Sequence, residues 1–587
     1  MRKVNSAGLA LLLGLVTILS APHVSAQKSR AAAVAAASRA PSANFAAERE
    51  AAERITTDKL KEMLYYIASD EMAGRNTPSP GLDMTAKYIA DRIGKLKLKP
   101  AGDKKSFFQN IEMRSTEVDR AKTSAGLNGR TFKVGDDFLP SGINSGEAEA
   151  PLVYVGQGWV FKPKNINAYE GLDVSGKIVV VSGNGMTPPS GVTPREISAA
   201  PAGDWESPIS YARKHGAKGL VLVPRNFERV WRFGAASLAR PSYRVVRFDE
   251  EAGGDTDAAD KKTKDKKDKD KTTEAKPLPD SLPTIVPSRE MLSALFEGEG
   301  TDGARLLQAS IAGESLKGFA LSPSKLLRVA VSLRVNRANS QNVVAVLEGR
   351  DSKLKKEYVA LGAHYDHVGV GRAVNGDSIY NGADDDGSGT TSLLAMAEAF
   401  AKGPRPKRSI LFVWHMGEEK GLWGSEYFTN YPTVPLKAIV AQLNIDMIGR
   451  SKKAGDANPK NKMLTGPDEI YVIGSKMMST ELGNLSESVN SSYLNLRFNY
   501  HYDEPNDPEK LFYRSDHFNY ARKGIPIIFY FDGVHEDYHQ PSDSPDKIDY
   551  EKMMKVTRTV FILASEIANA LARPVLDKQL PPERMQR

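Results

Sequence analysis

Six nearly continuous apolar runs in the C-terminal half of the chain constrain the fold more than any other feature. They are NVVAVLEG, YVALGAH, SILFVWHMG, AIVAQLNIDMIG, IYVIG and IPIIFYFDG, all downstream of Asn342. Strands buried on both faces have this character, in contrast to the alternating pattern of half-exposed strands. Helical stretches such as Gly389 to Lys402 and Tyr550 to Leu571 separate or follow the runs. The alternation predicts an α/β fold with a mixed, largely parallel sheet flanked by helices.

The N-terminal half contains two kinds of sequence pattern, one helical and one β-rich. Helical apolar spacing runs from Ile55 to Ala68 and again from Leu82 to Leu98, and NTPSPG separates the two segments. From about residue 145, short β-rich runs such as GKIVVVSGN and GAKGLVLVP alternate with Gly, Pro and Asp, and SPISYARKHGAK reads as one crossover helix. We therefore expect a first part of the main domain at 51–144, an inserted β-rich domain at 145–330, the main α/β domain at 331–575 and a tail at 576–587.

The first residues resemble a secretory signal. Arg2 and Lys3 precede the apolar stretch Ala7 to Ala21, and Val24-Ser25-Ala26 fits a small-x-small cleavage site. We expect a signal peptide at 1–26, a flexible lead-in at 27–50, and a secreted or periplasmic bacterial protein. The signal retained as a membrane anchor is the alternative, and no later stretch has the length of a membrane span.

Composition excludes several classes of function. The chain has no cysteine, which rules out disulfides, thiolate catalysis and Cys-type zinc sites. Its formal charge of +8 is small for 587 residues and gives no nucleic-acid signal. The segment 255–276 mixes lysines with acids, so we interpret it as a disordered charged loop.

Polar residues gather where the apolar runs end. In open α/β sheets, ligands bind at the carboxyl ends of strands. Each feature alone has an ordinary structural explanation, such as a helix N-cap or a buried, hydrogen-bonded carboxylate. Five such features, all at or just after the ends of the apolar runs, are hard to explain by a contribution to folding stability alone. They are His364 with Asp366, the triplet Asp384 to Asp386, Glu418 with Glu419, Asp446, and Tyr538 with His539.

Charge balance indicates metal ions at these strand ends. Carboxylates gathered in one cleft are costly unless cations neutralise them. Two Zn²⁺ would balance three carboxylate ligands and one hydroxide, with two neutral imidazoles completing the site. His, Asp and Glu are common zinc ligands, and a site without sulfur suits hydrolysis better than structure. Two metals about 3.5–4 Å apart can hold both a nucleophile and a polarised carbonyl.

The motifs resemble a known family. GAHYDHVG, NGADDDGSG, GEEKGLWGSE, NIDMIG and YHQPSD are similar, in order and spacing, to the metal-binding motifs of the secreted di-zinc aminopeptidase and glutamate carboxypeptidase family. The likeness covers Asn342 to about Ala572 and extends to the helices of Asp70 to Gly102. The inserted segment resembles the protease-associated domain found inside such enzymes, mainly through GLDVSGKIVVVSG and ARKHGAKGLVLV. The resemblance thus implies the zinc exopeptidase fold.

The resemblance also implies a role for each motif residue. One zinc would be bound by His364 and Asp446, the other by Glu419 and His539, with Asp385 bridging the two and Asp384 and Asp386 in support. Asp366 would orient His364, and Tyr538 would donate a hydrogen bond to the developing oxyanion. Glu418 would be the general base, taking a proton from water at zinc and passing it to the leaving amine.

The family pattern leaves the remaining histidines near the motifs without a ligand role. They are His367, His415, His501, His517 and His535. RSDHFNY, Arg514 to Tyr520, is interpreted as lining the substrate cleft or supporting the metals, with simple packing as the alternative. The aromatic segment Phe498 to Tyr513 is interpreted as packing, with a side-chain pocket as the alternative.

The sequence thus predicts a di-zinc exopeptidase acting on peptide substrates, most simply an aminopeptidase. A carboxypeptidase or dipeptidase of the same family is the first alternative, since a basic cluster for a substrate carboxylate cannot be located from sequence. Glutaminyl cyclase, which works with one zinc, is the second, and a non-catalytic, receptor-like binding protein is the third. Oligomeric state stays open.

Overall fold

The computed structural model describes residues 45–140, 144–201, 203–238, 240–251, 273–274 and 282–580. The predicted signal peptide at 1–26 and most of the lead-in and of the charged loop lie outside these residues. The last lead-in residues belong to helix α2 (Phe45–Ala52), which buries Ala51 and Ala52.

The main domain is built on a mixed sheet of eleven described strands, which confirms the predicted α/β class. At its centre β21, β18, β22 and β25 run parallel, while β17 and β23 flank them antiparallel. Two short strands, β1 (Lys99–Pro100) and β13 (Thr273–Glu274), also pair with β17. The order of the others is β12 (Ser242–Val245), β2 (Phe108–Val118), β17 (Leu333–Leu347), β21 (Ser409–His415), β18 (Tyr358–His364), β22 (Ile439–Ile445), β25 (Ile527–Phe531), β23 (Glu469–Ile473) and β24 (Arg497–Asn499).

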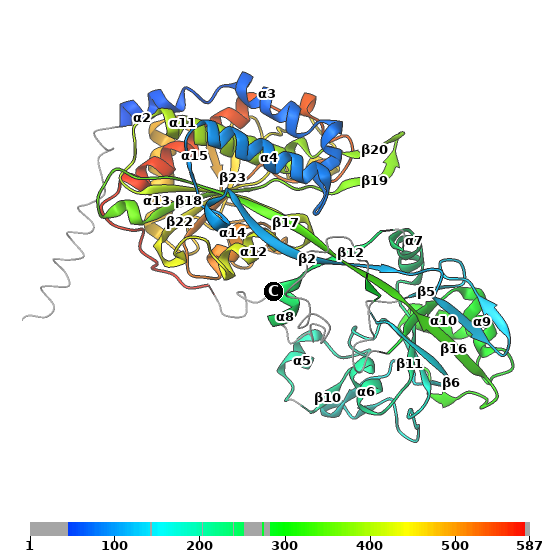
Figure 1. Ribbon diagram of the computed structural model, residues 1–587. Helices are drawn as coiled ribbons and strands as arrows, with labels where there is room; N and C mark the ends of the chain where they lie inside the picture. The colour runs from blue at the N-terminus through cyan, green and yellow to red at the C-terminus, as the bar shows by residue number, and fades with distance from the viewer. Residues whose placement is uncertain are drawn as a thin grey trace, which may run out of the picture.

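Both faces of this sheet are buried, as the continuous apolar runs predict. In β21, Ile410, Phe412 and Trp414 enter the core on one face, while Leu411 and Val413 enter the core on the other. This two-residue alternation is the normal geometry of a strand. Figure 1 shows the helices in layers on the two sides. One layer contains α3 (Thr57–Ile67), α4 (Pro80–Lys95), α11 (Gly389–Lys402) and α15 (Tyr550–Asn569), and the other contains α12 (Trp423–Asn430) and α14 (His517–Ala521).

Local sequence accounts for the ends of the N-terminal helices. Thr56 caps α3 by accepting a hydrogen bond from the Lys59 N–H, and Ser79 caps α4 in the same way, with Pro80 in its first turn. The two helices bury one apolar face each, including Leu60, Leu64 and Ile89. A third helix, α13 (Thr480–Ser492), adds Leu482 and Val489 to the same core.

A second sheet holds the inserted β-rich region. Helices α9 (Arg289–Phe296) and α10 (Gly303–Ala312) pack on one face, and α6 (Pro208–Lys214), the predicted crossover, packs on the other. The sheet includes residues from Ser124 onward, so the predicted boundary at 145 falls inside it. Its order is β4 (Arg130–Phe132), β3 (Ser124–Leu127), β16 (Leu326–Val331), β6 (Gly146–Tyr154), β9 (Ile178–Ser182), β11 (Gly219–Val223), β14 (Thr284–Pro287) and β5 (Phe138–Pro140), with β15 (Phe319–Ala320) beside β6.

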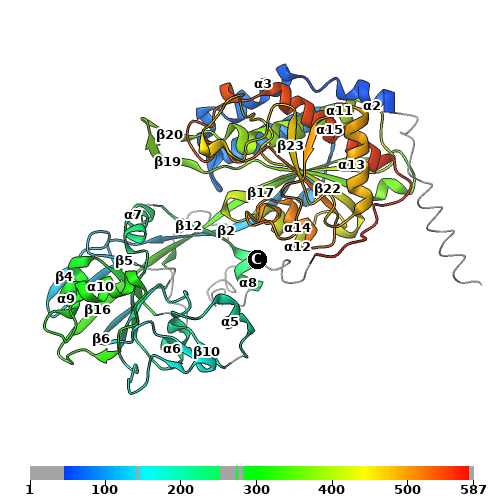
Figure 2. The same cartoon turned by 180° about the vertical axis from the view of Figure 1, so that it is seen from behind.

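A ribbon built on strands β2 and β17 joins the two sheets, with β12 paired to β2 and β13 paired to β17. Strands β2 and β17 pair antiparallel from Phe108–Val343 to Val118–Leu333. The chain leaves the main domain along β2 and returns along β17, as both views show (Figures 1 and 2). No helix among the described residues is long and apolar enough to cross a membrane.

Candidate metal centre

The four parallel strands end at the same edge of the main sheet, and the predicted motifs follow directly. His364 is the last residue of β18, and Asp446 follows β22. After β21 the chain turns at Gly417, whose φ of +66° suits glycine, and Glu418 and Glu419 begin a short helical turn. His539 lies in the loop after β25. The topology therefore brings together residues that are far apart in sequence.

The aspartate triplet forms an irregular turn, Ala383–Ser388, at the start of α11. Asp386 anchors this turn, because its carboxylate accepts hydrogen bonds from the backbone N–H groups of His364, Gly389 and Met447. Asp384 accepts one from Gly449, 2.7 Å away. Asp385 alone of the three has its carboxylate between His364 and His539.

One group of ligand atoms surrounds His364. Its Nε2 lies 3.3 Å from Oδ1 of Asp385, 3.5 Å from Oδ1 of Asp446 and 3.9 Å from Oε2 of Glu418. Ser515 donates a hydrogen bond to the other oxygen of Asp446 at 2.5 Å, which fixes that carboxylate. His364, Glu418 and Asp446 thus form a candidate metal position with Asp385 at its edge.

A second group lies on the other side of Asp385. Nε2 of His539 is 3.0 Å from Oδ2 of Asp385 and 3.1 Å from Oε1 of Glu419. Nδ1 of His367 is 2.9 Å from the same Glu419 oxygen. Asp385 therefore offers one oxygen to each group, as a bridging ligand must.

Buried atoms without hydrogen-bond partners show that this donor set fits metal ions. Nε2 of His364, Nδ1 of His367, Oε1 of Glu419 and Nε2 of His539 are all buried, and none has a hydrogen-bond partner among the described residues. Such atoms are rare in native proteins, since each costs about 1–3 kcal/mol. Nitrogen and carboxylate donors converging without sulfur are the ligands zinc uses in hydrolytic sites.

The pKa values of the two adjacent glutamates are shifted in opposite directions. Burial, and to a lesser extent Asp446 and Glu419, raise the pKa of Glu418 well above its ordinary value. Burial and Asp385 also act to raise the pKa of Glu419, but His367 and His539 outweigh them and lower it. Neighbouring carboxyls with pKa values pushed apart are typical of an acid–base residue beside a permanently ionised one.

Asp366 contacts both its predicted partner, His364, and Glu418. Nδ1 of His364 is 3.2 Å from the backbone oxygen of Asp366 and 3.7 Å from its carboxylate. That carboxylate accepts a hydrogen bond from the Glu418 N–H at 3.1 Å. Asp366 thus fixes the backbone of the glutamate pair as well as facing the histidine.

Sequence reasoning missed three residues of this centre. His367 was assigned no ligand role, yet its ring enters the second group. Asp543 accepts hydrogen bonds from the N–H groups of Asp384 and Asp385 and so holds the triplet. Arg75, fully buried, donates to four backbone carbonyls, including those of Asn381 and Gly382. Asp543 stands in the quoted motif YHQPSD, which is the signal that could have identified it.

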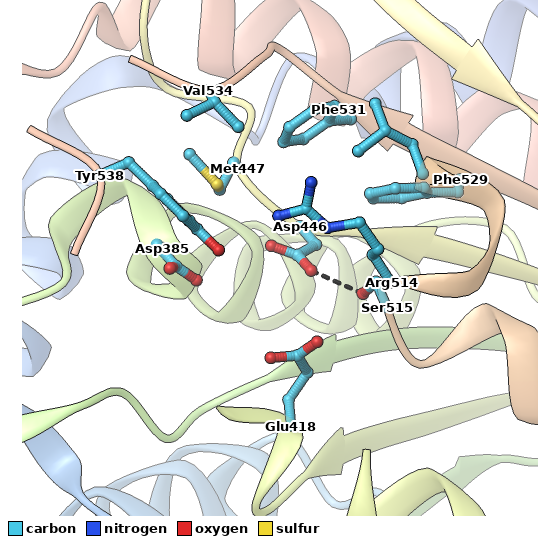
Figure 3. A pocket seen from close by; sticks show the side chains of 11 residues that line it. Asp385, Glu418, Asp446, Met447, Arg514, Ser515, Phe529, Phe531, Val534 and Tyr538 are labelled. Carbon is cyan, nitrogen blue, oxygen red and sulfur yellow. Dashed lines mark hydrogen bonds between the residues drawn. The ribbon is translucent and has the colours of Figure 1, made fainter. Parts of the chain in front are cut away.

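A pocket opens beside the first group (Figure 3). Asp385, Glu418 and Asp446 form its acidic side, and the Tyr538 hydroxyl points toward Asp385. Burial, with the nearby carboxylates, raises the pKa of Tyr538, so the hydroxyl keeps its proton to donate. Apolar side chains form the opposite side, namely Met447, Leu511, Phe529, Phe531 and Val534. Part of the predicted aromatic segment and the first residues of RSDHFNY therefore line the pocket.

Arg514 is the one basic residue that lines this pocket. Its guanidinium extends over Asp446 in Figure 3, and it has no ion-pair partner among the residues that the structure describes. The other polar residues of RSDHFNY are buried. Two of them contact His415 of β21: Asp516 lies 3.3 Å from its ring, and the Tyr520 hydroxyl lies 3.0 Å from it.

Known proteins resemble this chain over the same region. Residues 342–564 match the model of Peptidase family M28. A probable leucine aminopeptidase of Arthroderma otae is 28% identical over 239 residues, which cover 39% of this chain and 58% of that protein. Leucine aminopeptidase 2 of Trichophyton rubrum is 24% identical over 265 residues, 41% of this chain and 47% of that protein. The chain thus spans less than two thirds of the length of these curated relatives.

Among solved structures, the chain is similar to an aminopeptidase from Aneurinibacillus sp. strain AM-1, with 17% identity and a TM-score of 0.48 over 91% of this chain and 98% of that one. It is also similar to BSAP, a zinc aminopeptidase from Bacillus subtilis, with 17% identity and a TM-score of 0.44 over 89% and 98%. The match to the model of Peptidase family M28 contains every polar strand end described above, so the residues of the candidate metal centre all lie within the part of the chain that is similar to this family.

Proposed function

We propose that the protein is a zinc exopeptidase that removes N-terminal residues from peptides. The observation that carries this proposal is the convergence of two groups of ligand atoms on the two oxygens of Asp385, with Glu418 and an open pocket beside one group. The matched family consists of peptidases, and the relatives named above are aminopeptidases, which supports the same reading.

Bound zinc ions would supply Lewis acidity and lower the pKa of water at the site. His364, Asp385 and Asp446 would hold one ion, and Asp385, Glu419 and His539 the other. Glu418 faces the first group and the pocket, so it can take a proton there and return it to the leaving amine. The Tyr538 hydroxyl lies across the pocket and can donate to an oxygen that gains negative charge.

The lining of the pocket suits a substrate whose N-terminal residue has an apolar side chain. Phe529, Phe531 and Leu511 offer an apolar wall that such a side chain would cover. The free amine of the substrate would lie beside the carboxylates of Glu418 and Asp446, where its positive charge is favoured.

Arg514 favours a second candidate, a dipeptidase or carboxypeptidase. An unpaired guanidinium beside the reacting groups is suited to bind a substrate carboxylate, since it can hold both oxygens at once. Such a carboxylate is present in a dipeptide or at a peptide C-terminus, and is absent from aminoacyl amides.

One panel of substrates tests these candidates. It compares aminoacyl amides, N-blocked peptides and free dipeptides, each with and without chelator. We expect the aminoacyl amides to be cleaved, the blocked peptides to resist, and chelator to abolish turnover. Cleavage of N-blocked peptides from the C-terminus would contradict the aminopeptidase proposal, and turnover that survives complete metal removal would contradict the zinc mechanism.

Two further proposals concern the rest of the chain. The residues of the second sheet would act as a protease-associated domain that covers the pocket or guides substrates toward it. The N-terminal signal-like residues would direct the enzyme out of the cytoplasm. Fractionation of the native cells tests the latter, and enzyme confined to the cytoplasm would contradict it.

A further inference from the structure

We propose that His367 is a sixth metal ligand, which gives one metal position a complete set of four protein ligands and leaves the other open. This inference rests on the proposed zinc site but goes beyond it, because the motif resemblance assigns five ligands and leaves His367 none. His367 follows Asp366 in HYDH, three residues after His364, and its side chain is fully buried.

The distances around His367 suit tetrahedral coordination. Zinc bound at about 2.0–2.2 Å by four ligands requires donor atoms about 3.4 Å apart. Nδ1 of His367 lies 2.9 Å from Glu419 Oε1 and 3.6 Å from Asp385 Oδ2. Nε2 of His539 lies 3.0 Å from the same Asp385 oxygen and 3.1 Å from the same Glu419 oxygen. All four donor atoms are within 4.8 Å of one another.

These contacts do not have the geometry of hydrogen bonds. Although Nδ1 of His367 and Oε1 of Glu419 are close, both are buried atoms without a hydrogen-bond partner among the described residues, and the same holds for Nε2 of His539. The atoms therefore face a common point rather than one another. A histidine that only oriented Glu419 would direct an N–H at its oxygen, as the usual partners of metal ligands do.

The other metal position has a different character. Its protein ligands are His364, Asp446 and the shared Asp385, and two of them line the pocket together with Glu418. By contrast, His367, Glu419 and His539 do not line the pocket. Four protein ligands are typical of closed structural zinc sites, and three are typical of catalytic ones. We therefore expect a tight, closed position and a weaker, open position that carries the chemistry.

Measuring bound zinc at increasing chelator concentrations tests the predicted difference in zinc affinity between the two positions. Wild-type protein loaded with two zinc ions should lose one at a chelator concentration that leaves the second bound. His367→Ala should lose both together, because the closed position loses a ligand and weakens by more than the ~10–100-fold typical of changes outside the ligand shell. His364→Ala should lose only the weaker ion. His501→Ala, which changes an exposed histidine of the same domain, should behave as wild type.

X-ray absorption of wild-type protein carrying one equivalent of zinc gives a second readout that needs no variant. We expect two imidazoles per zinc, from His367 and His539, whereas one imidazole would overturn the inference. Unchanged zinc release in a folded His367→Ala protein would overturn it as well, and would leave the proposed function intact. Wild-type protein that binds no zinc would instead contradict the proposed function itself.

Discussion

Glu418 and Glu419 show how one turn of backbone gives two identical side chains different surroundings. The turn begins at Gly417, so consecutive side chains leave in different directions. Glu419 faces two histidines that keep it ionised, while Glu418 faces Asp446 and retains its proton more readily. Burying both would be costly without cations. His364 offsets part of that cost for Glu418, whereas His367 and His539 together outweigh it for Glu419.

The pair predicts two distinguishable variants. Glu418→Gln should retain both metals and lose about 10²–10⁴-fold in kcat, since it removes a proton-transfer group and no ligand. Glu419→Gln should bind one metal ion less tightly. Metal content by mass spectrometry and steady-state kinetics measure the two effects. If both variants lost the same metal, the division of roles would be wrong.

Arg514 predicts a change in substrate preference. Arg514→Gln should raise KM for dipeptides with a free C-terminal carboxylate by roughly 10-fold or more, because it removes a charge-assisted contact worth about 1.5–3 kcal/mol. Aminoacyl amides, which lack that carboxylate, serve as the control and should keep their KM. Equal effects on both substrate types would show that Arg514 positions the pocket rather than the carboxylate.

The positions of most site residues could be predicted from the sequence, because each ends an apolar run or follows it closely. The position of His367 could not be predicted, since nothing in HYDH shows that its second histidine side chain also turns inward. Arg75 was also hidden: its hydrogen bonds reach carbonyls some 300 residues away, and no local pattern marks such a contact.

At the scale of elements, helix α2 carries a buried acid whose partner is another acid. Glu48 is 3% exposed. Burial, and then Glu566 of helix α15, raise its pKa from 4.5 to about 7, although Asn569 donates a hydrogen bond to it. The folded state therefore binds a proton that the unfolded chain has released between these two pH values. Packing of α2 against α15 must weaken as pH rises through this range.

This packing predicts a pH-dependent stability that one substitution removes. The wild type should lose on the order of 3 kcal/mol between pH 4.5 and 7 from Glu48, and Glu48→Gln should lose correspondingly less. Urea unfolding at several pH values measures the difference. Glu50→Gln, an exposed position on the same helix, is the matched control. Parallel pH curves for the wild type and Glu48→Gln would refute the assignment.

The predicted elements agree well with those observed where apolar periodicity was strong. The structure has α11 at the predicted Gly389 to Lys402, and α15 ends two residues before the predicted Leu571. The start of the second sheet was harder to place. Its first strands, β3 to β5, have only three or four residues each, too few to show a period. Of these, β3 and β5 pair with strands that come much later in the chain.

At the scale of the whole molecule, every strand of the second sheet lies between β2 and β17 in the chain, and β12 and β13 of the same segment pair with those two strands. We expect this segment to be removable. Val118 and Leu333 are directly paired, and paired residues lie about 5 Å apart, so an Asn-Gly turn can join them in place of residues 119–332. The shortened chain should bind zinc and cleave aminoacyl amides.

Comparison of short and long peptides then tests the role of the removed residues. If the second sheet guides substrates, kcat/KM for long peptides should change while that for aminoacyl amides stays within about threefold, a shift of less than 1 kcal/mol. A shortened enzyme that folds and cleaves both unchanged would contradict a guiding or covering role. The deletion also removes β12, so β2 becomes an edge strand of the main sheet. The zinc content of the shortened protein is the control that its metal site is intact.

The ribbon also sets an order of events during synthesis. Residues 45–118 emerge from the ribosome long before β17, which pairs with β2 along its whole length and lies roughly 200 residues later. At about 5–20 residues per second this is a delay of roughly 10–40 s. During that time the N-terminal helices have no sheet to pack on and β2 has an unpaired edge. If the chain is exported as we propose, this interval keeps the main α/β domain unfinished, in the open state that a translocation channel can accept.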